Sequence, residues 1–264
     1  MMPELPEVET IVRDLAETVG STIEKIQILD RELELPAKEI MGSQIASIGR
    51  RGKYIVFQLD PAGKLVFHMR MSGRLLRICA EGEWKYSRLV LHLSRGVIHF
   101  VDPRRLGTVE FCCNGFPHTL GIDPFDKRFT PKRLTEIVGT SRGSVKCVLM
   151  DQRKIAGIGN IYASEALWRA MIDPRRTGNS LEKRDLRRLH PAIVELLNDA
   201  ILHMGCTLGD SVSDYRSATG ESGEFQDALR VYGREGEPCD RCGETIAKIK
   251  QAGRSTYFCP HCQS

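Results

Sequence analysis

The sequence lacks any apolar run that approaches the roughly 18 residues needed to cross a membrane. Its first residues also lack the basic cluster and the apolar stretch of a secretion signal. Basic residues are scarce there, because residues 1–39 hold 4 Lys and Arg against 10 Asp and Glu. These absences predict a cytosolic protein, and its 264 residues are enough for two domains with a sizeable core.

Basic residues are instead concentrated in the rest of the chain. The remaining 225 residues hold 34 Lys and Arg against 24 Asp and Glu. Such a surplus suits a polyanionic partner such as nucleic acid. On charge alone, however, an ordinary solvated surface is the better explanation.

The nine cysteines fall into two groups. Five are scattered in mostly apolar surroundings, which predicts buried thiols: Cys79, Cys112, Cys113, Cys147 and Cys206. The other four form two CxxC pairs sixteen residues apart, and they are Cys239, Cys242, Cys259 and Cys262. Four thiolates complete a tetrahedral shell, which predicts one structural Zn²⁺. Disulfides are the competing interpretation, but nothing in the sequence indicates an oxidising compartment.

The segment between the two cysteine pairs predicts a β-hairpin. Residues 246–258 alternate like two strands around a turn, and Arg254 stands beside Gly253 at that turn. An Arg on a rigid turn can contact a phosphate. An exposed turn residue without a ligand explains Arg254 equally well.

Residues 128–204 have a helical pattern. Thr130 and Pro131 predict a helix start, and a last helix is expected over residues 182–203. Between them, Gly157 and Gly159 predict a tight turn with positive φ, and Asn160 is expected to cap the following helix. Free N–H groups at such a helix start can hold a phosphate, although a plain helix–helix corner is the alternative.

The front of the chain predicts one helix followed by a sheet domain. The first helix has an apolar face of Val8, Ile11, Val12, Leu15 and Val19. Residues 22–113 then contain short β-rich segments separated by Gly or Pro, which predict a β-sandwich or a flattened barrel. The five clearest strands are residues 54–60, 64–70, 87–94, 96–102 and 107–113.

The loops of this sheet domain combine basic and apolar residues. One loop, residues 68–73, contains Met71 between arginines, and another, residues 102–107, contains Arg104 and Leu106. An exposed Arg beside an exposed Met or Leu is used to insert into a base stack and hold it open. A Met is usually a core residue, so the prediction depends on both loops having this composition.

Taken together, these segments resemble the formamidopyrimidine-DNA glycosylases, bacterial enzymes that remove oxidised purines from DNA. The resemblance covers essentially the whole chain in order and spacing. Leu5 favours this branch over the related enzymes for oxidised pyrimidines, which tend to begin Pro-Glu-Gly-Pro-Glu. The matching segments are PELPEVE (3–9), GRRGKY (49–54), HMRMSG (68–73), DPRRLG (102–107), MDQRKIAGIGNIYASEALW (150–168), VYGREGEPC (231–239) and the four-cysteine tail.

The resemblance implies an α+β fold with three parts. Residues 1–127 would form a catalytic domain with an N-terminal helix and a β-sandwich. Residues 128–230 would form a helix–two-turns–helix DNA-binding domain, and residues 231–264 a zinc-finger hairpin. Double-stranded DNA with oxidised purines or abasic sites would be the partner. The protein would be a monomer in the bacterial cytosol, with no membrane partner.

The resemblance also implies catalytic roles. Pro3 would be the nucleophile that forms a Schiff base with the sugar, and Glu4 the general acid/base. Lys53 would assist β-elimination and bind a phosphate. Arg254 would bind a phosphate next to the lesion and assist δ-elimination.

Further residues would bind the DNA. Met71, Arg104 and Leu106 would fill the space left by the flipped base, and Asn160 would bind a flanking phosphate. Arg88 and Lys146 are also predicted to contact DNA. Residues 217–229 match the loop that closes over a flipped oxidised guanine in this family.

The sequence departs from the family pattern at three positions. Leu106 replaces the usual Phe, so stacking beside the orphaned base should weaken. Arg88 stands where a His commonly contacts DNA and is expected to bind phosphate instead. Pro3 follows Met1 and Met2, and an amide nitrogen is no nucleophile. We therefore expect translation to begin at Met2, whose removal would free Pro3.

Three other functions stay open from the sequence. A non-catalytic damage-binding protein of the same fold would result if Pro3 stayed blocked. An oxidised-pyrimidine glycosylase would share most of the motifs. A zinc-ribbon RNA-binding protein would explain the tail, but not the motifs at residues 3–9, 68–73 and 102–107.

Overall fold

A computed structural model describes residues 2–78, 85–208 and 215–264. Their contacts divide the chain into two units that are not continuous in sequence. Unit 1 contains residues 1–118 and 201–226, and unit 2 contains residues 119–200 and 227–264. The predicted domain boundaries after residues 127 and 230 stay a prediction. The segment 201–226, however, packs with the N-terminal part of the chain.

Unit 1 begins with helix α1, Leu5–Leu15. Val8, Ile11 and Leu15 of the predicted apolar face are buried, and Val12 is partly buried. A 3₁₀ turn η1, Ala16–Thr18, ends the helical segment. Val19 therefore lies beyond the helix and is 36 % exposed. A buried acceptor fixes the helix start, because the backbone N–H of Glu4 donates to Glu7 Oε2 at 2.8 Å.

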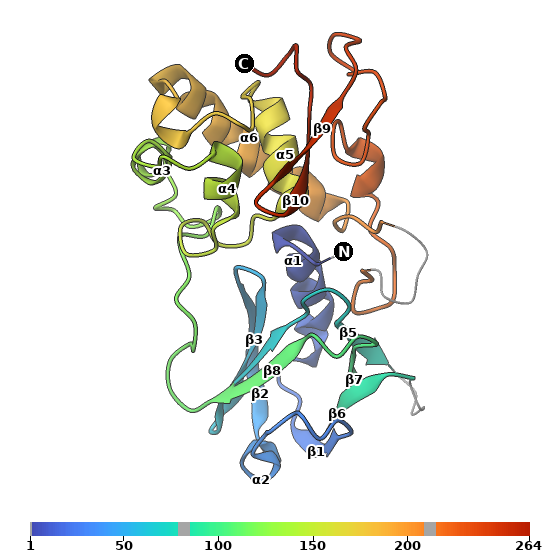
Figure 1. The fold of residues 1–264 in the computed structure, drawn as a ribbon. Helices are drawn as coiled ribbons and strands as arrows, with labels where there is room; N and C mark the ends of the chain where they lie inside the picture. Colours follow the sequence, from blue (N-terminus) through green and yellow to red (C-terminus); the bar gives the residue numbers. More distant parts are fainter. Residues whose placement is uncertain (1, 79–84, 209–214) are drawn as a thin grey trace. The chain divides into compact units, whose positions relative to one another are not determined.

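Two antiparallel four-stranded sheets follow (Figure 1). The first has the order β1-β6-β7-β5, with β1 Ile23–Ile28, β5 Arg74–Ile78, β6 Ser87–Leu93 and β7 Gly96–Val101. The second has the order β2-β3-β4-β8, with β2 Gln44–Arg51, β3 Tyr54–Asp60, β4 Gly63–His68 and β8 Thr108–Cys112. A single short helix turn, α2 Ala37–Ile40, connects β1 to β2.

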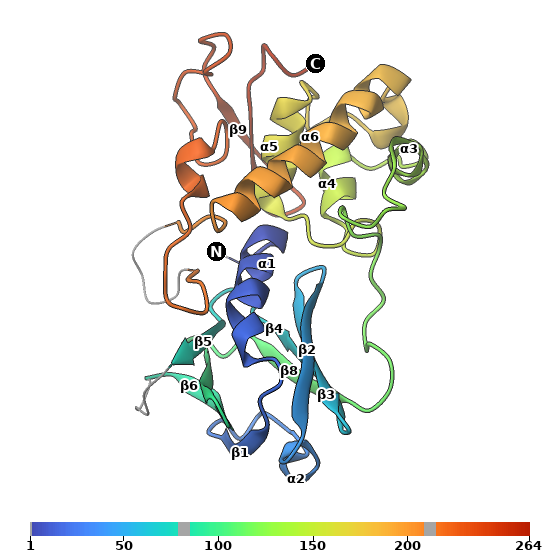
Figure 2. The ribbon, with the colours of Figure 1, turned by 180° about the vertical axis from the view of Figure 1, so that it is seen from behind.

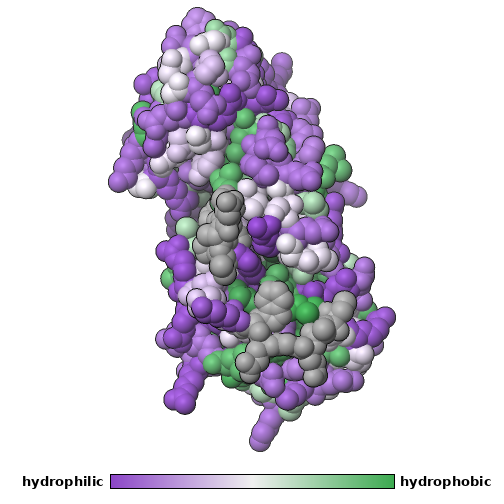
Figure 3. All heavy atoms as spheres, turned by 90° about the vertical axis from the view of Figure 1, so that its right-hand side faces the viewer, coloured by the Kyte–Doolittle hydropathy of each residue, from purple (hydrophilic) through white to green (hydrophobic). Residues whose placement is uncertain are grey.

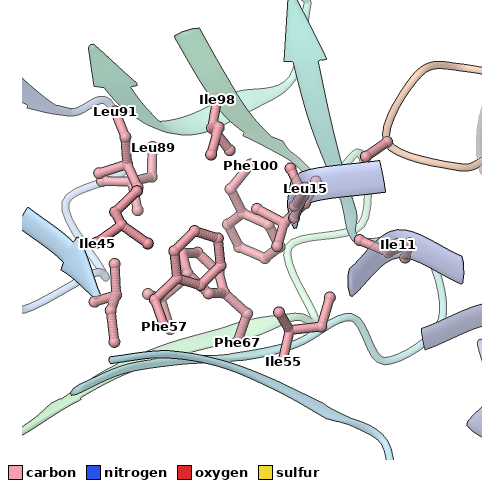
Figure 4. Close-up of a cluster of buried hydrophobic side chains, with 14 of the residues drawn as sticks. Ile11, Leu15, Ile45, Ile55, Phe57, Phe67, Leu89, Leu91, Ile98 and Phe100 are labelled. Atoms are coloured by element: carbon pink, nitrogen blue, oxygen red, sulfur yellow. The ribbon is translucent and has the colours of Figure 1, made fainter. Parts of the chain in front are cut away.

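The core of unit 1 lies between these two sheets and α1 (Figure 4). Phe57 and Phe67 come from one sheet and Phe100 from the other, and the ring centroids of Phe67 and Phe100 lie 5.8 Å apart. Ile11 and Leu15 of α1 close the cluster at its edge. Each of these side chains is at most 1 % exposed, so the β-rich segments and the first helix predicted from the sequence supply the core.

Unit 2 is mainly helical. Its helices are α3 Pro131–Val138, α4 Val145–Met150 and α5 Asn160–Arg169, and a 3₁₀ turn η2, Gly178–Ser180, precedes the long helix α6, Lys183–Leu202. Figure 2 shows α6 running across α4 and α5. The predicted cap of α3 is confirmed, because Thr130 Oγ1 accepts the backbone N–H of Arg133 at 3.2 Å.

The C-terminal part of unit 2 is the predicted hairpin. A 3₁₀ turn η3, Phe225–Ala228, leads into it, and strand β9, Ala247–Gln251, pairs antiparallel with β10, Arg254–Phe258. Trp168 of α5 packs with Val231, Ile246, Cys239 and Cys259 in a small buried cluster. The helix–two-turns–helix region and the cysteine hairpin thus share one core, and the α+β prediction is confirmed.

Hydrophilic residues cover most of the face shown in Figure 3, and the hydrophobic residues there lie in small separate groups. Within the described ranges, no helix is both long enough and apolar enough to span a membrane.

Candidate active site and nucleic-acid interface

The first candidate residues lie at the start of α1. Pro3 and Glu4 are both buried, and Glu4 is the residue before the first helical turn. The nitrogen of Pro3 forms the peptide bond to Met2, so in this form it has no free amine lone pair. The role of Pro3 as a nucleophile stays a prediction, and it would require a free nitrogen at this residue.

Glu7 fixes this start from within the helix. Its Oε2 accepts the Glu4 N–H at 2.8 Å, and its Oε1 accepts the backbone N–H of Cys206 at 2.8 Å. Gly205 packs so closely that a Cβ there would lie 2.5 Å from Glu7 Oε1. Gly205 also has φ +76°, so glycine is required for both reasons. Glu7 thus connects the Pro3–Glu4 pair to the segment after α6, a role that the sequence analysis did not assign.

Lys53 is positioned by the tight turn between β2 and β3. Arg51 pairs with Tyr54, so only Gly52 and Lys53 connect the two strands. Gly52 supplies φ +57°, as the first residue of a type II′ hairpin turn requires. Lys53 is 4 % exposed, which is unusual for a lysine and marks a specific environment for its ammonium group.

His68 lies at the end of β4 in the same unit. Burial, together with the nearby positive charges of Arg70 and Lys53, lowers the pKa of His68 from 6.5 to about 3. The neutral imidazole accepts the backbone N–H of Arg70 on Nδ1 at 3.0 Å. Arg70 has φ +52°, so His68 stabilises an unfavourable backbone conformation directly before Met71.

The two predicted DNA-inserting loops are both found at the ends of strands. We define the Met71 loop as residues 69–73, between β4 and β5, and the Leu106 loop as residues 102–107, between β7 and β8. Met71 is 38 % exposed and Leu106 is 45 % exposed, although Met and Leu are usually buried. Arg104 is exposed beside Leu106, so the arrangement expected of an inserting loop is present.

Arg88 has a different environment from the one expected of a phosphate ligand. It is 5 % exposed, and its Nε donates to Asp30 Oδ2 at 2.6 Å. Its Nη1 donates to the carbonyl oxygen of Gly107 at 2.7 Å. Direct contact between Arg88 and DNA stays a prediction, and the burial of the side chain argues against it.

Unit 2 brings Lys146, Asn160 and the zinc hairpin together. Lys146 is 1 % exposed, and its Nζ donates to Asn160 Oδ1 at 2.7 Å, Ser255 O at 3.0 Å and Thr256 Oγ1 at 2.7 Å. Asn160 Nδ2 also donates to Ser255 O, at 3.0 Å. Lys146 therefore connects α4 with α5 and β10, and contact between its ammonium group and DNA stays a prediction.

The predicted phosphate-binding turn differs in two details. The residue that caps α5 is Gly159, and Asn160 is the first helical residue, so the expectation that Asn160 caps this helix is wrong. The side chain of Asn160 instead accepts a hydrogen bond from Lys146 and donates one to the carbonyl oxygen of Ser255. Gly157 has the expected positive φ of +97°, whereas Gly159 has φ −128°.

Arg254 begins β10 directly after the hairpin turn and is exposed. Ala252 and Gly253 form the turn with φ +46° and +78°. The neighbouring Ser255 and Thr256 are held by Lys146. The guanidinium of Arg254 thus extends from a braced strand, as a phosphate-binding Arg requires.

The four cysteines of the tail converge on one point. Their sulfur atoms all lie within 4.8 Å of one another, and the Sγ atoms of Cys242 and Cys259 are 3.5 Å apart. Four thiolates at about 2.3 Å from one Zn²⁺ would be about 3.8 Å apart, so the set fits a tetrahedral zinc ion. Cys239, Cys242, Cys259 and Cys262 are its ligands, and the ion would supply structure rather than chemistry.

Comparison with known proteins covers the same three regions. Family models match residues 2–109 (formamidopyrimidine-DNA glycosylase N-terminal domain), 120–211 (formamidopyrimidine-DNA glycosylase H2TH domain) and 236–264 (zinc finger found in FPG and IleRS). The chain belongs to the formamidopyrimidine-DNA glycosylase family. The resemblance inferred from the motifs is therefore confirmed.

Individual members of the family match over their full length. The formamidopyrimidine-DNA glycosylase of Desulfitobacterium hafniense is 42 % identical, covering 99 % of this chain and 100 % of the relative. The crystal structure of the MutM (Fpg) protein from Thermus thermophilus is 36 % identical with a TM-score of 0.89, covering 99 % of this chain and 98 % of the other. The Lactococcus lactis Fpg complex with DNA containing an abasic site is 36 % identical with a TM-score of 0.87, covering 99 % of both chains.

Proposed function

We propose that the chain is a base-excision-repair DNA glycosylase with AP lyase activity. Its substrate is double-stranded DNA that contains oxidised purines, namely 8-oxoguanine and formamidopyrimidines, or abasic sites. The observation that carries the proposal is the Pro3–Glu4 pair held by Glu7 at the start of α1, in a chain that matches all three domain models of the glycosylase family.

The reaction begins at the nitrogen of Pro3 once that nitrogen is a free secondary amine. It attacks the anomeric carbon of the damaged nucleotide, and the base departs with the electron pair of its broken bond and takes up the proton that the amine loses. Opening of the sugar ring then leaves an iminium that links the sugar to Pro3. Glu4 protonates the sugar ring oxygen as the ring opens. The iminium acidifies the neighbouring C–H, so the same covalent intermediate leads to strand cleavage by β-elimination.

The remaining candidate residues act on phosphates and on the base stack. Lys53 binds a phosphate and assists β-elimination. Arg254 and Asn160 bind phosphates beside the lesion, and Arg254 assists δ-elimination. Met71, Arg104 and Leu106 occupy the space that the flipped base leaves, because apolar and guanidinium groups can replace lost stacking. The zinc ion holds the hairpin that presents Arg254.

We place this activity in the bacterial cytosol, because the matched relatives are bacterial proteins named as DNA glycosylases. The protein would act as a monomer.

One observation favours a second function for a different form of the chain. With Met2 still attached, the amide nitrogen of Pro3 cannot attack a sugar, and that form would bind damaged DNA without cleaving it.

A lesion competition separates these functions. The protein, with its mature N-terminus determined by mass spectrometry, is incubated with equal amounts of duplexes containing 8-oxoguanine or thymine glycol. We expect preferential release of 8-oxoguanine and strand products with phosphate at both new ends. Preferential cleavage at thymine glycol would favour an oxidised-pyrimidine glycosylase. Tight binding without product, from a chain that begins at Pro3, would contradict the enzymatic proposal.

A further inference from the structure

Arg88 occupies an irregular position in its strand. The pairing of β6 with β7 shifts between Ser87 and Leu89, so Arg88 is the extra residue of a β-bulge. A bulge redirects a side chain away from the ordinary alternation of the strand. The carbonyl oxygen of Arg88 accepts the backbone N–H groups of Leu29 and Asp30, at 2.9 and 3.2 Å. Backbone and side chain of Arg88 are therefore both docked on the same segment after β1.

The guanidinium of Arg88 lies in a buried charged network within unit 1. Besides its bonds to Asp30 and Gly107, its Nη1 lies 3.4 Å from Asp102 Oδ2. The side chains of Arg88, Asp30 and Asp102 are 6 %, 5 % and 0 % exposed. Buried charges of this kind are tolerated only when they are paired and hydrogen-bonded, and here each carboxylate faces at least one guanidinium.

Asp102 connects the two DNA-inserting loops. Its Oδ1 accepts the hydroxyl of Ser72, which follows Met71, and the backbone N–H of Arg104 at 3.2 Å. Its Oδ2 accepts the backbone N–H of Gly107 at 2.6 Å. One carboxylate thus fixes the Met71 loop and both ends of the Leu106 loop, and Arg88 supplies its counter-charge.

Asp30 fixes the middle of the Leu106 loop. Its two carboxylate oxygens accept Nε and Nη2 of Arg105. Arg105 has φ +54°, a conformation that costs a non-glycine residue about 1–2 kcal/mol unless other contacts hold it. Arg105 also holds the pKa of Asp30 well below its usual range, so Asp30 is charged at neutral pH.

We propose that Arg88 is a positioning residue for the two loops, a proposal that rests on the proposed function. Through Asp30, Asp102 and Gly107 it fixes the Leu106 loop and, through Ser72, the Met71 loop, so that both loops insert into DNA as one unit. It does not bind a phosphate.

The competing role, a phosphate ligand, makes different predictions. A phosphate contact contributes about 0.9 to the slope of log affinity against log salt concentration, and its loss lowers that slope. A positioning residue leaves the salt slope unchanged and lowers the ability of the loops to open the base stack. Neutralising Asp30 also separates the two roles. If Arg88 is a phosphate ligand, the change frees its guanidinium for a phosphate. If Arg88 is a positioning residue, the change disorders the Leu106 loop.

The test uses two variants of the network on the full chain. Arg88→Lys keeps the buried positive charge but removes the planar fork that bonds Asp30 and Gly107 together. Asp30→Asn keeps the shape of the side chain and removes its charge. Arg254→Ala is the comparison variant for a lost phosphate contact. Arg128→Lys, on a solvent-exposed pair with Asp126, is the matched control for an ordinary ion pair.

Three measurements are made on each protein. Hydrogen exchange of the peptide spanning 102–107 reports the loop without DNA. Fluorescence of pyrrolocytosine opposite a tetrahydrofuran abasic analogue reports unstacking without any chemistry. Affinity for the same duplex at several salt concentrations gives the salt slope. We expect both network variants to exchange roughly tenfold faster and to lose about half of the fluorescence change, with the wild-type salt slope. Arg128→Lys should match the wild type.

The outcomes are distinguishable from a failure of the proposed function. If Arg88→Lys leaves hydrogen exchange and fluorescence at the wild-type values, a positive charge at this position is sufficient, as for a phosphate ligand, and the proposal is overturned. Unchanged exchange in Asp30→Asn overturns it as well. If the wild-type chain cleaves no lesion but the exchange and fluorescence results hold, the positioning role stands and the enzymatic function fails.

Discussion

The low pKa of His68 predicts an acid-sensitive fold in unit 1. Burial and the charges of Arg70 and Lys53 hold this pKa near 3, against about 6.5 in an unfolded chain. Because the folded state disfavours the protonated form, His68 contributes stability that is present above pH 6.5 and is lost as the pH falls towards 3. Between pH 8 and pH 5 the loss from this one group amounts to about 2 kcal/mol.

The substitution His68→Asn isolates this contribution. The Oδ1 atom of asparagine can replace Nδ1 as the acceptor for the Arg70 N–H, which lies 3.0 Å from the imidazole nitrogen, and asparagine does not titrate. The variant loses the ring contact with Tyr54, whose centroid lies 4.5 Å away, so it is less stable than the wild type at pH 8. The informative quantity is therefore the change in the free energy of unfolding with pH.

The assay is urea unfolding followed by circular dichroism at pH 8 and pH 5. The wild type should lose about 2 kcal/mol more than His68→Asn between these two values, since the carboxylates titrate alike in both proteins. Equal losses in the two proteins would refute the conclusion that His68 is buried in its neutral form. Such a result would also remove the argument that a neutral His68 holds the backbone of Arg70 directly before Met71.

Three further predictions concern the zinc site and the residues predicted to bind DNA. A chelator that removes zinc should release one equivalent of metal per chain, measured with a chromogenic indicator. It should also lower DNA affinity by roughly tenfold, because the hairpin that carries Arg254 is no longer held by the metal. A metal-free chain with full affinity would contradict this prediction. Lys146→Met should lower the melting temperature and weaken binding to an abasic duplex. Asn160, Ser255 and Thr256 would each lose the hydrogen bond from the ammonium group, and each buried acceptor left without a donor costs about 1–3 kcal/mol. Normal binding with normal melting would argue against a role for Lys146 in holding β10. Leu106→Phe should tighten binding to an abasic duplex by roughly fivefold in fluorescence anisotropy, because a ring stacks on the orphaned base; weaker binding would show that leucine is the better fit here.

The strands that the sequence identified are mainly the central ones. Four of them, β3, β4, β6 and β7, lie inside their sheets. Buried residues alternate along β3, and β4, β6 and β7 are buried over most of their length, so all four have a clear apolar pattern. The strands not singled out, β1, β2 and β5, are all edge strands. Edge strands carry more exposed and charged residues, as β1 does with Glu24 and Lys25, so their pattern is weaker.

The candidate site shows a similar division. The four cysteines could be located from the sequence because their spacing defines them. The two loops could be located because each combines Arg with an apolar residue and both match motifs of the resembling family. Arg88 and Lys146 also stood out as cations, but their burial depends on acceptors distant in the chain, Asp30 and Thr256. The same applies to Glu7, whose partner Cys206 is 199 residues away. A capping pattern, Glu4 followed by Glu7, was the one local signal for that residue.

The central claim is that Pro3 becomes the covalent nucleophile. Its most direct test is borohydride reduction of the protein mixed with a duplex containing 8-oxoguanine opposite cytosine, followed by mass spectrometry of the cross-linked peptide. We predict a stable adduct on the nitrogen of Pro3, with no residue preceding it. An adduct on a lysine such as Lys53, or no adduct from a chain that begins at Pro3 and binds the duplex, would contradict the account.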